Sequence, residues 1–321
     1  MLMNGNRAKR KKIKRHFRKL GISLLFQGGL LWAVVIAFMV VQIFPALFLT
    51  PDLTEQQMEK QFINPLQESG WPMILAVVIA FIPLLIYRKK LFWTHDLTTV
   101  GKRMNRRIVF IGFVFVLGLN MIFMLIMYPV EGLLHLFGYT AEPSEEILEG
   151  SKTISMFVYT CLIAPIFEEF IYRGAVLRSL ERFGSFFAIT GSALLFGMMH
   201  GNIIQLPVAF GTGIVLGYLA KTYSIWLTIL IHSLNNLLSE AISAVHSEVL
   251  SAILNSGLLV AVFLVLGVFL YKNRNAIRSW LHAAWEKRPE KKLWLYFFTS
   301  IPIILLLLFN GVAILLGIEK L

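Results

Sequence analysis

Residues 164–174, with the sequence APIFEEFIYRG, place three ionisable side chains inside an otherwise apolar run. A charged residue at the bilayer centre costs at least about 2.5–3.5 kcal/mol, so it usually faces a protein cavity and marks a functional site. Glu169 and Arg173 are four residues apart and can pair on one helix face. Glu168 points about 100° away from that face, which leaves its carboxylate available as a general base. A purely structural Glu–Arg pair would explain Glu169 and Arg173 but not Glu168.

Two later apolar runs also contain polar side chains that can bind or transfer protons. The sequence FGMMHGN at 196–202 ends one run at His200. The sequence IHSLNN at 231–236 contains His232 and Asn236, which share a helix face because they are four residues apart. Taken alone, either run is explained equally well by a satisfied polar residue or by hydrogen bonds between helices.

The expected depth of these residues in the membrane links the three runs. At about 1.5 Å per residue, Glu168 lies about 15 Å from the end of its run. On the same scale, His200 lies about 22 Å and His232 about 12 Å from the start of their runs. All three reach the middle of a hydrocarbon core about 30 Å thick. Such a set of polar residues at one depth indicates a shared site, because packing alone does not require it.

The runs that must position these residues indicate an all-α, polytopic transmembrane helix bundle. Hydrophobic residues make up 57% and charged residues 15% of the 321 positions, against about 45–50% and about 25% in soluble domains. The first apolar run is longer than the about 7–15 residues of a signal peptide, so we expect a retained anchor. About nine spans are expected, at 22–49, 71–87, 108–130, 154–180, 185–200, 203–220, 224–246, 249–271 and 293–318.

The distribution of charge predicts a cytoplasmic N-terminus and, with nine spans, a C-terminus outside. Of the 30 Lys and Arg residues, 23 fall in the segments 1–20, 88–107 and 272–292, which flank apolar runs. Cytoplasmic loops are enriched in these residues, so the net charge of +12 requires no nucleic-acid partner. Anionic lipid is the expected partner of the basic segments. Two loops expected outside contain nine acids, namely Asp52, Glu55, Glu59, Glu68, Glu131, Glu142, Glu145, Glu146 and Glu149.

The polar residues of the three runs resemble the three ordered motifs of the CPBP intramembrane proteases. That family includes the type II CAAX prenyl endopeptidases and the bacterial Abi and bacteriocin-immunity proteins. The resemblance covers about residues 152–240, and Tyr172 stands where the family often has Phe. The matching motifs are Glu168-Glu169-x-x-x-Arg173, Phe196-x-x-x-His200 and His232-x-x-x-Asn236.

The resemblance implies a hydrolase that cleaves a peptide bond of a membrane-associated or lipidated peptide or protein. Glu168, assisted by His200, would activate a water molecule. His232 and Asn236 would stabilise the oxyanion of the tetrahedral intermediate, as side-chain donors can. Arg173 would hold Glu169 and orient the helix.

The resemblance also suggests a division of the chain into four parts. Residues 1–20 form a basic cytoplasmic segment, 21–150 contain three spans, 151–247 form a catalytic CPBP/Abi-like core, and 248–321 contain the C-terminal helices. The basic loop 272–292 separates the last helix from the others, so we expect that helix to be an appendage. Within the core, Gly213 and Gly217 form a GxxxG motif, which predicts close helix packing in lipid.

A metal is the main alternative within this mechanism. Glu168, His200 and His232 could supply N/O ligands to zinc with one position open for water. The sequence contains no HExxH helix, in which two histidines would bind zinc beside a catalytic glutamate. We therefore favour a metal-free glutamate mechanism without a cofactor, and a zinc-dependent mechanism is the alternative.

Two other functions are compatible with a polar site at this depth. One is a transporter, although the paired repeats common in transporters are not evident, since the Glu-Glu-x-x-x-Arg segment has no second copy. The other is a non-catalytic membrane partner, such as an immunity protein. The polybasic inner segments and the simple topology indicate a multi-pass protein of a bacterial plasma membrane.

Overall fold

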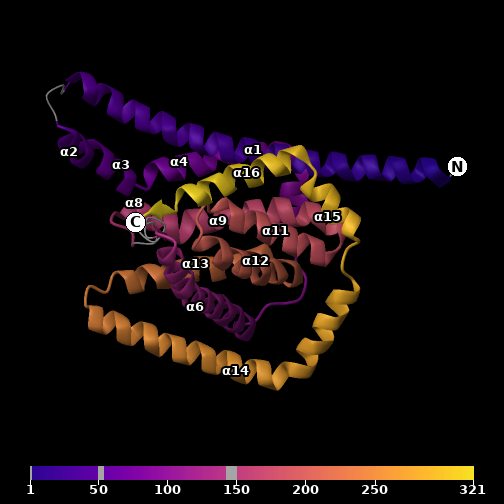
Figure 1. Ribbon diagram of the computed structural model, residues 1–321. Helices are drawn as coiled ribbons and strands as arrows, with labels where there is room; N and C mark the ends of the chain where they lie inside the picture. Colours follow the sequence, from indigo (N-terminus) through magenta and orange to yellow (C-terminus); the bar gives the residue numbers. More distant parts are fainter. Residues whose placement is uncertain (1, 50–53, 142–149) are drawn as a thin grey trace.

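The computed structural model describes residues 2–49, 54–141 and 150–321, and it is a bundle of helices (Figure 1). In these ranges the only strands are the two-residue β1 (Tyr139–Thr140) and β2 (Glu319–Lys320), which pair antiparallel. The all-α, membrane-type fold expected from the sequence is therefore confirmed. Five of the nine acids expected in the outer loops, Asp52, Glu142, Glu145, Glu146 and Glu149, lie outside the described residues.

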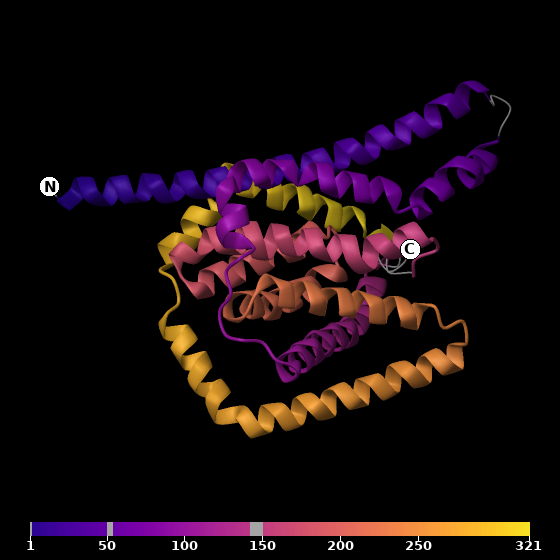
Figure 2. The same cartoon turned by 180° about the vertical axis from the view of Figure 1, so that it is seen from behind.

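The first part of the chain forms one long helix and a set of shorter ones. The long helix α1 packs along α4, α5 and α16, as two opposite views show (Figures 1 and 2). The elements of this part are α1 (Leu2–Leu49), α2 (Glu55–Met58), the π-helical turn η1 (Glu59–Ile63), α3 (Asn64–Glu68), α4 (Trp71–Ala80), α5 (Ile82–Arg88), the π-helical turn η2 (Phe92–Asp96) and α6 (Arg106–Leu136).

The segment with the two adjacent glutamates is one helical rod in which α-helical and π-helical stretches alternate. Its parts are α8 (Ile154–Val158), η3 (Tyr159–Ile163), α9 (Ala164–Glu169), η4 (Phe170–Val176), α10 (Leu177–Leu180) and the short 3₁₀ turn η5 (Glu181–Phe183). A π-helical stretch shifts the faces on which the following side chains lie and often occurs at a functional site. Here, the two π-helical stretches of the rod, η3 and η4, lie on either side of the glutamates.

The remaining helices complete the bundle around this rod. They are α11 (Ser185–Met199), α12 (Gln205–Thr222), α13 (Ile225–Ser243), α14 (Glu248–Glu286), α15 (Lys291–Phe298) and α16 (Ile301–Leu316). Helices α11 and α12 pack closely because small residues face each other. A Cβ at Gly213 would lie 3.0 Å from the Cβ of Ala193, and one at Gly217 would lie 3.2 Å from the side chain of Ile189. The GxxxG motif therefore serves close packing, as expected.

The last helix is not an appendage, and this expectation from the sequence is wrong. Phe297 is fully buried, and its ring lies 5.4 Å from that of Phe17 and 5.6 Å from that of Phe187. Helix α16 packs on both α1 and α11. Because the charged linker wraps back around the bundle (Figure 2), separation in sequence does not become separation in space.

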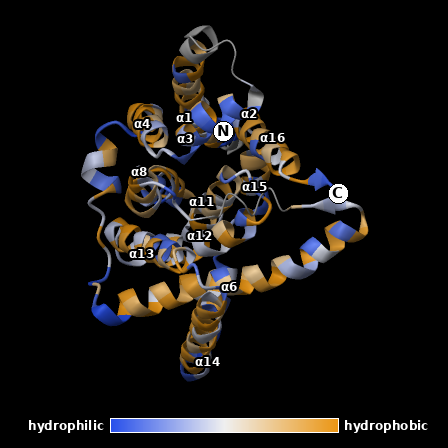
Figure 3. Ribbon diagram, turned by 90° about the vertical axis from the view of Figure 1, so that its left-hand side faces the viewer, coloured by the Kyte–Doolittle hydropathy of each residue, from blue (hydrophilic) through white to orange (hydrophobic). Residues whose placement is uncertain are grey.

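The outer surface of the bundle suits a lipid environment. Hydrophobic residues dominate α4, α14 and α16 when the bundle is viewed from one end (Figure 3). In the described ranges, six helices are long and apolar enough to cross a membrane, or seven when the pair α15–α16, which bends by 70°, is taken as one span. Helix α11 has only 15 residues, and α12 is not among the six. The multi-pass character is confirmed, whereas the count of nine and the orientation stay predictions.

Candidate active site

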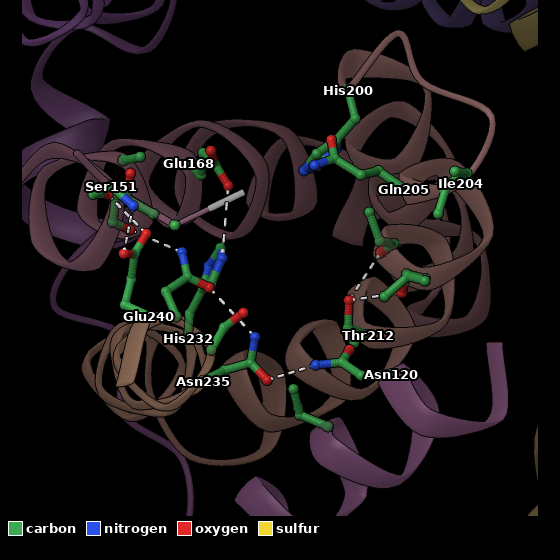
Figure 4. Close-up of a pocket in the computed structure, with 18 of the residues that line it drawn as sticks. Asn120, Ser151, Glu168, His200, Ile204, Gln205, Thr212, His232, Asn235 and Glu240 are labelled. Carbon is green, nitrogen blue, oxygen red and sulfur yellow. Dashed lines mark hydrogen bonds and ion pairs between the residues drawn. The ribbon is translucent and has the colours of Figure 1, made fainter. Parts of the chain in front are cut away.

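A cavity of about 960 Å³ lies between α6, the rod α8–α9, α11, α12 and α13. Four of the residues predicted from the sequence line it, namely Glu168, His200, His232 and Asn236. Figure 4 shows Glu168 and His200 facing the cavity from different helices, with His232 directly below Glu168. The three sequence runs therefore meet at one cavity, and their common depth in the membrane stays a prediction.

Glu169 and Arg173 form the ion pair expected from their spacing, beneath the cavity rather than in it. Both side chains are fully buried, and Nη1 of Arg173 donates to Oε1 of Glu169 over 2.9 Å. The guanidinium also lies over the ring of Phe196, 4.1 Å from its centroid. A desolvated cation over an aromatic face adds about 2 kcal/mol. Phe196 thus explains why an aromatic residue begins the second motif, a role that the sequence did not indicate.

His232 connects the buried ion pair to the cavity. Its Nδ1 lies 3.0 Å from Oε1 of Glu169, and its Nε2 lies 3.7 Å from Oε2 of Glu168. The imidazole therefore stands between the two adjacent glutamates. Glu168, with 19% of its side chain exposed, contacts His232 rather than Arg173. The sequence placed Glu168 and Glu169 on different faces correctly, but it did not predict that His232 from α13 would touch both.

His200 is held at the end of α11 by a tight turn. Its Nδ1 lies 2.9 Å from the carbonyl oxygen of Phe196, one turn earlier. The next residue, Gly201, has a φ of +57°, a conformation that residues with a side chain rarely adopt. Asn202 closes the turn before α12, because its Oδ1 accepts hydrogen bonds from the backbone N–H groups of Ile204 and Gln205. The His-Gly-Asn sequence therefore fixes where His200 enters the cavity.

The amide of Asn236 is anchored by the rod. Its Nδ2 donates to the carbonyl oxygen of Thr160 over 2.9 Å, and its Oδ1 accepts a weaker hydrogen bond from Asn235 over 3.3 Å. Thr160 lies in the π-helical turn η3. Because these contacts orient the amide, one of its two N–H groups is occupied and the other is available to a ligand.

Several polar residues of the cavity were not identified from the sequence. Asn120 on α6 donates to Asn235 over 2.7 Å, and Glu240 accepts hydrogen bonds from both the backbone N–H and the hydroxyl of Ser151, each over 2.8 Å. Glu240 could have been found, because it continues the helix face of His232 and Asn236 at four-residue spacing. Nothing near Asn120 in the sequence marks it as a site residue.

The arrangement of these side chains does not fit a three-ligand zinc site. Glu168 and His232 approach each other, but over residues 2–49, 54–141 and 150–321 no group of three His, Cys, Asp or Glu side chains is placed to hold a metal ion. Because Nδ1 of His200 is directed at the carbonyl oxygen of Phe196, only Nε2 of this imidazole remains to bind a ligand.

Comparison with known proteins agrees with this geometry. Residues 150–238 match the family model described as "Type II CAAX prenyl endopeptidase Rce1-like". The chain is 27% identical over 217 residues, 64% of its length and 85% of the relative, to the "Putative membrane peptidase YdiL" of Bacillus subtilis (strain 168). It is also 27% identical over 137 residues, 39% of its length and 53% of the relative, to the "Membrane-embedded CAAX protease MroQ" of Staphylococcus aureus (strain USA300). No solved structure gives a significant match.

The matched region contains most of the cavity. The rod, α11, α12 and most of α13 lie within residues 150–238, whereas Asn120 and Glu240 lie outside that range. Over these helices the chain therefore resembles the Rce1-like CAAX proteases. The comparisons support a membrane protease of the CAAX-protease type.

Proposed function

We propose that this membrane protein, with its Rce1-like CAAX protease domain at 150–238, is an intramembrane endopeptidase that uses a glutamate-activated water. The observation that carries the proposal is the different environment of two adjacent carboxylates. Glu169 is fully buried and held by Arg173, whereas Glu168 faces a cavity large enough for a peptide segment. A structural ion pair needs only the first of these two groups.

The chemistry begins with a water molecule between Glu168 and His200. Glu168 takes a proton from this water, and the resulting hydroxide adds to the carbonyl carbon of the scissile peptide bond. The oxyanion that forms is stabilised by side-chain donors from α13, namely Asn236 and, when its Nε2 carries a proton, His232. Collapse of the intermediate breaks the C–N bond, and the proton held by Glu168 passes to the departing amine. Arg173 acts indirectly, by keeping Glu169 charged and in position against His232.

The substrate that this site suits is a membrane-associated or lipidated peptide or protein. The cavity is formed within the helix bundle, so a substrate reaches it at the membrane. The basic segments expected at the cytoplasmic side would bind anionic lipid of a bacterial plasma membrane. With anionic lipid as the partner of the basic segments, the proposal requires no nucleic-acid partner.

Hydrolysis of a candidate membrane peptide by the purified protein tests this proposal. The Glu168→Ala variant is expected to lose hydrolysis and to retain its fold. Glu68→Gln is a matched control, since it changes a carboxylate that lines the same cavity at its exposed rim. Full activity of Glu168→Ala would exclude the mechanism. Retention of the peptide without cleavage by both wild type and control would indicate a binding protein or a transporter.

A further inference from the structure

The cavity is not centred between the two ends of the bundle. On α13 the lining residues run from His232 to Glu240, although the helix begins at Ile225. On α6 they lie between Val116 and Tyr128, and on the rod α8–α10 they stop at Glu168. In the described chain, α13 and the rod therefore contribute the parts that lie toward a single end, the end at which α2, α3 and α8 lie in Figure 1, and α6 contributes its middle.

The exposure of the lining residues shows which way the cavity opens. Phe196 and Leu216, at its inner limit, are 2% and 1% exposed. Tyr128 and the side chain of Lys152, at its outer limit, are 65% and 59% exposed. The cavity is closed at the middle of the bundle and open at one end.

The floor beneath the closed end is sealed by buried polar contacts. Nη2 of Arg178 donates to the carbonyl oxygen of Ala220 over 2.9 Å, which ties the rod to α12. Oε1 of Glu181 forms ion pairs with Nη1 of Arg178 at 2.9 Å and with Nζ of Lys221 at 3.2 Å. A peptide approaching from this side would have to break these contacts.

The charges of the two ends differ in sign. The sealed end contains the start of α6 at Arg106 and Arg107, and the basic stretch of α1, because His16 packs 5.3 Å from Phe183. The open end contains Glu68, paired with Lys152 over 3.5 Å, and Glu240. Lys and Arg accumulate on the cytoplasmic side of membrane proteins. The sealed end is therefore the cytoplasmic one.

We infer that the cavity opens on the extracytoplasmic face, so that its substrate is a peptide segment presented from outside the membrane. Such a segment would be a translocated peptide or the outer juxtamembrane part of a membrane protein. A lipidated C-terminus held at the cytoplasmic face would meet the sealed end instead. The assignment of a substrate rests on the proposed function, whereas the direction of opening does not.

Cysteine labelling in intact cells tests the direction of opening. The background is the full chain with Cys161→Ser, which removes its one cysteine. Lys152→Cys and Ser239→Cys report on the open end, and Lys102→Cys, in an exposed stretch before α6, is the matched control for the sealed end. A membrane-impermeant maleimide is expected to label the first two as fully in intact as in permeabilised cells, and Lys102→Cys only after permeabilisation.

The opposite labelling pattern, or a lack of labelling of both open-end variants, would overturn the inference. Because labelling requires no turnover, an outward-labelled protein that hydrolyses nothing would refute the proposed function and leave the direction of opening intact. For a cleaved peptide, a bulky maleimide attached from outside to Ser239→Cys is expected to abolish its hydrolysis, compared with the same variant unlabelled. Unchanged hydrolysis would show that the substrate enters elsewhere.

Discussion

Exchange of either adjacent glutamate for glutamine separates catalysis from stability in this protein. Glu169→Gln removes the charge that balances Arg173 where both side chains are fully buried. Glu168→Gln removes a charge at the cavity surface, where the carboxylate lies 3.7 Å from Nε2 of His232. We expect the first change to reduce both stability and turnover, and the second to reduce turnover alone.

The expected magnitudes follow from burial. Breaking a buried ion pair by removing one partner costs about 3–5 kcal/mol, which lowers the ratio of folded to unfolded protein by about two to three and a half powers of ten. Glu168 lines a cavity and its carboxylate lies 3.7 Å from Nε2 of His232, beyond hydrogen-bond distance, so the free energy of unfolding should change less in Glu168→Gln than in Glu169→Gln. Loss of a general base lowers the rate by about 10²–10⁴-fold.

The assay compares wild type and the two variants for yield, melting temperature in detergent and turnover of one peptide. Turnover is normalised to folded protein, so that a loss of stability is not read as a loss of catalysis. Wild-type turnover in Glu168→Gln, together with a stable but inactive Glu169→Gln, would reverse the two roles. Full turnover by both variants would refute a mechanism that depends on either glutamate.

Three further predictions concern the metal, the topology and Phe196. Exhaustive chelation is expected to leave hydrolysis intact, and a loss that zinc alone restores would instead assign Glu168, His200 and His232 as ligands. A reporter fused after Leu321 is expected to be active only outside the cytoplasm, and a cytoplasmic signal would contradict the odd number of spans. Phe196→Leu removes the ring beneath Arg173 and should lower turnover per folded molecule, whereas Phe92→Leu, at another buried aromatic residue, should lower stability only.

The sequence predicted those features that the helix repeat and the thickness of the membrane control. The pairing of Glu169 with Arg173 follows from their four-residue spacing alone. The meeting of Glu168, His200 and His232 at one cavity follows from their distance to the ends of their apolar runs. Both arguments need only local geometry, because each helix in a bilayer has a fixed rise and a limited length.

Features that depend on the packing of distant helices were not predictable. The contact of His232 with both glutamates depends on how α13 is rotated against α9, and 63 residues separate His232 from Glu169. Asn120 and Asn235 are 115 residues apart. The burial of Phe297 similarly depends on how the chain returns after α14. The π-helical turns on both sides of the glutamates change the helix faces on which the following side chains lie, and no residue type in the sequence predicts such turns.

The contacts of His232 limit its part in the proposed reaction. Oε1 of Glu169 lies 3.0 Å from Nδ1 of His232 and also accepts a hydrogen bond from Arg173. An ionised carboxylate only accepts hydrogen bonds, so Nδ1 bears a proton and is not available to a substrate. Only Nε2 faces the reaction, and neutral His232 would present it as an acceptor, which a developing oxyanion repels. Asn236 is free of this restriction, because bonding to Thr160 leaves one N–H of its amide for the substrate. In the proposed mechanism, oxyanion stabilisation therefore depends first on Asn236, and on His232 only when Nε2 also carries a proton.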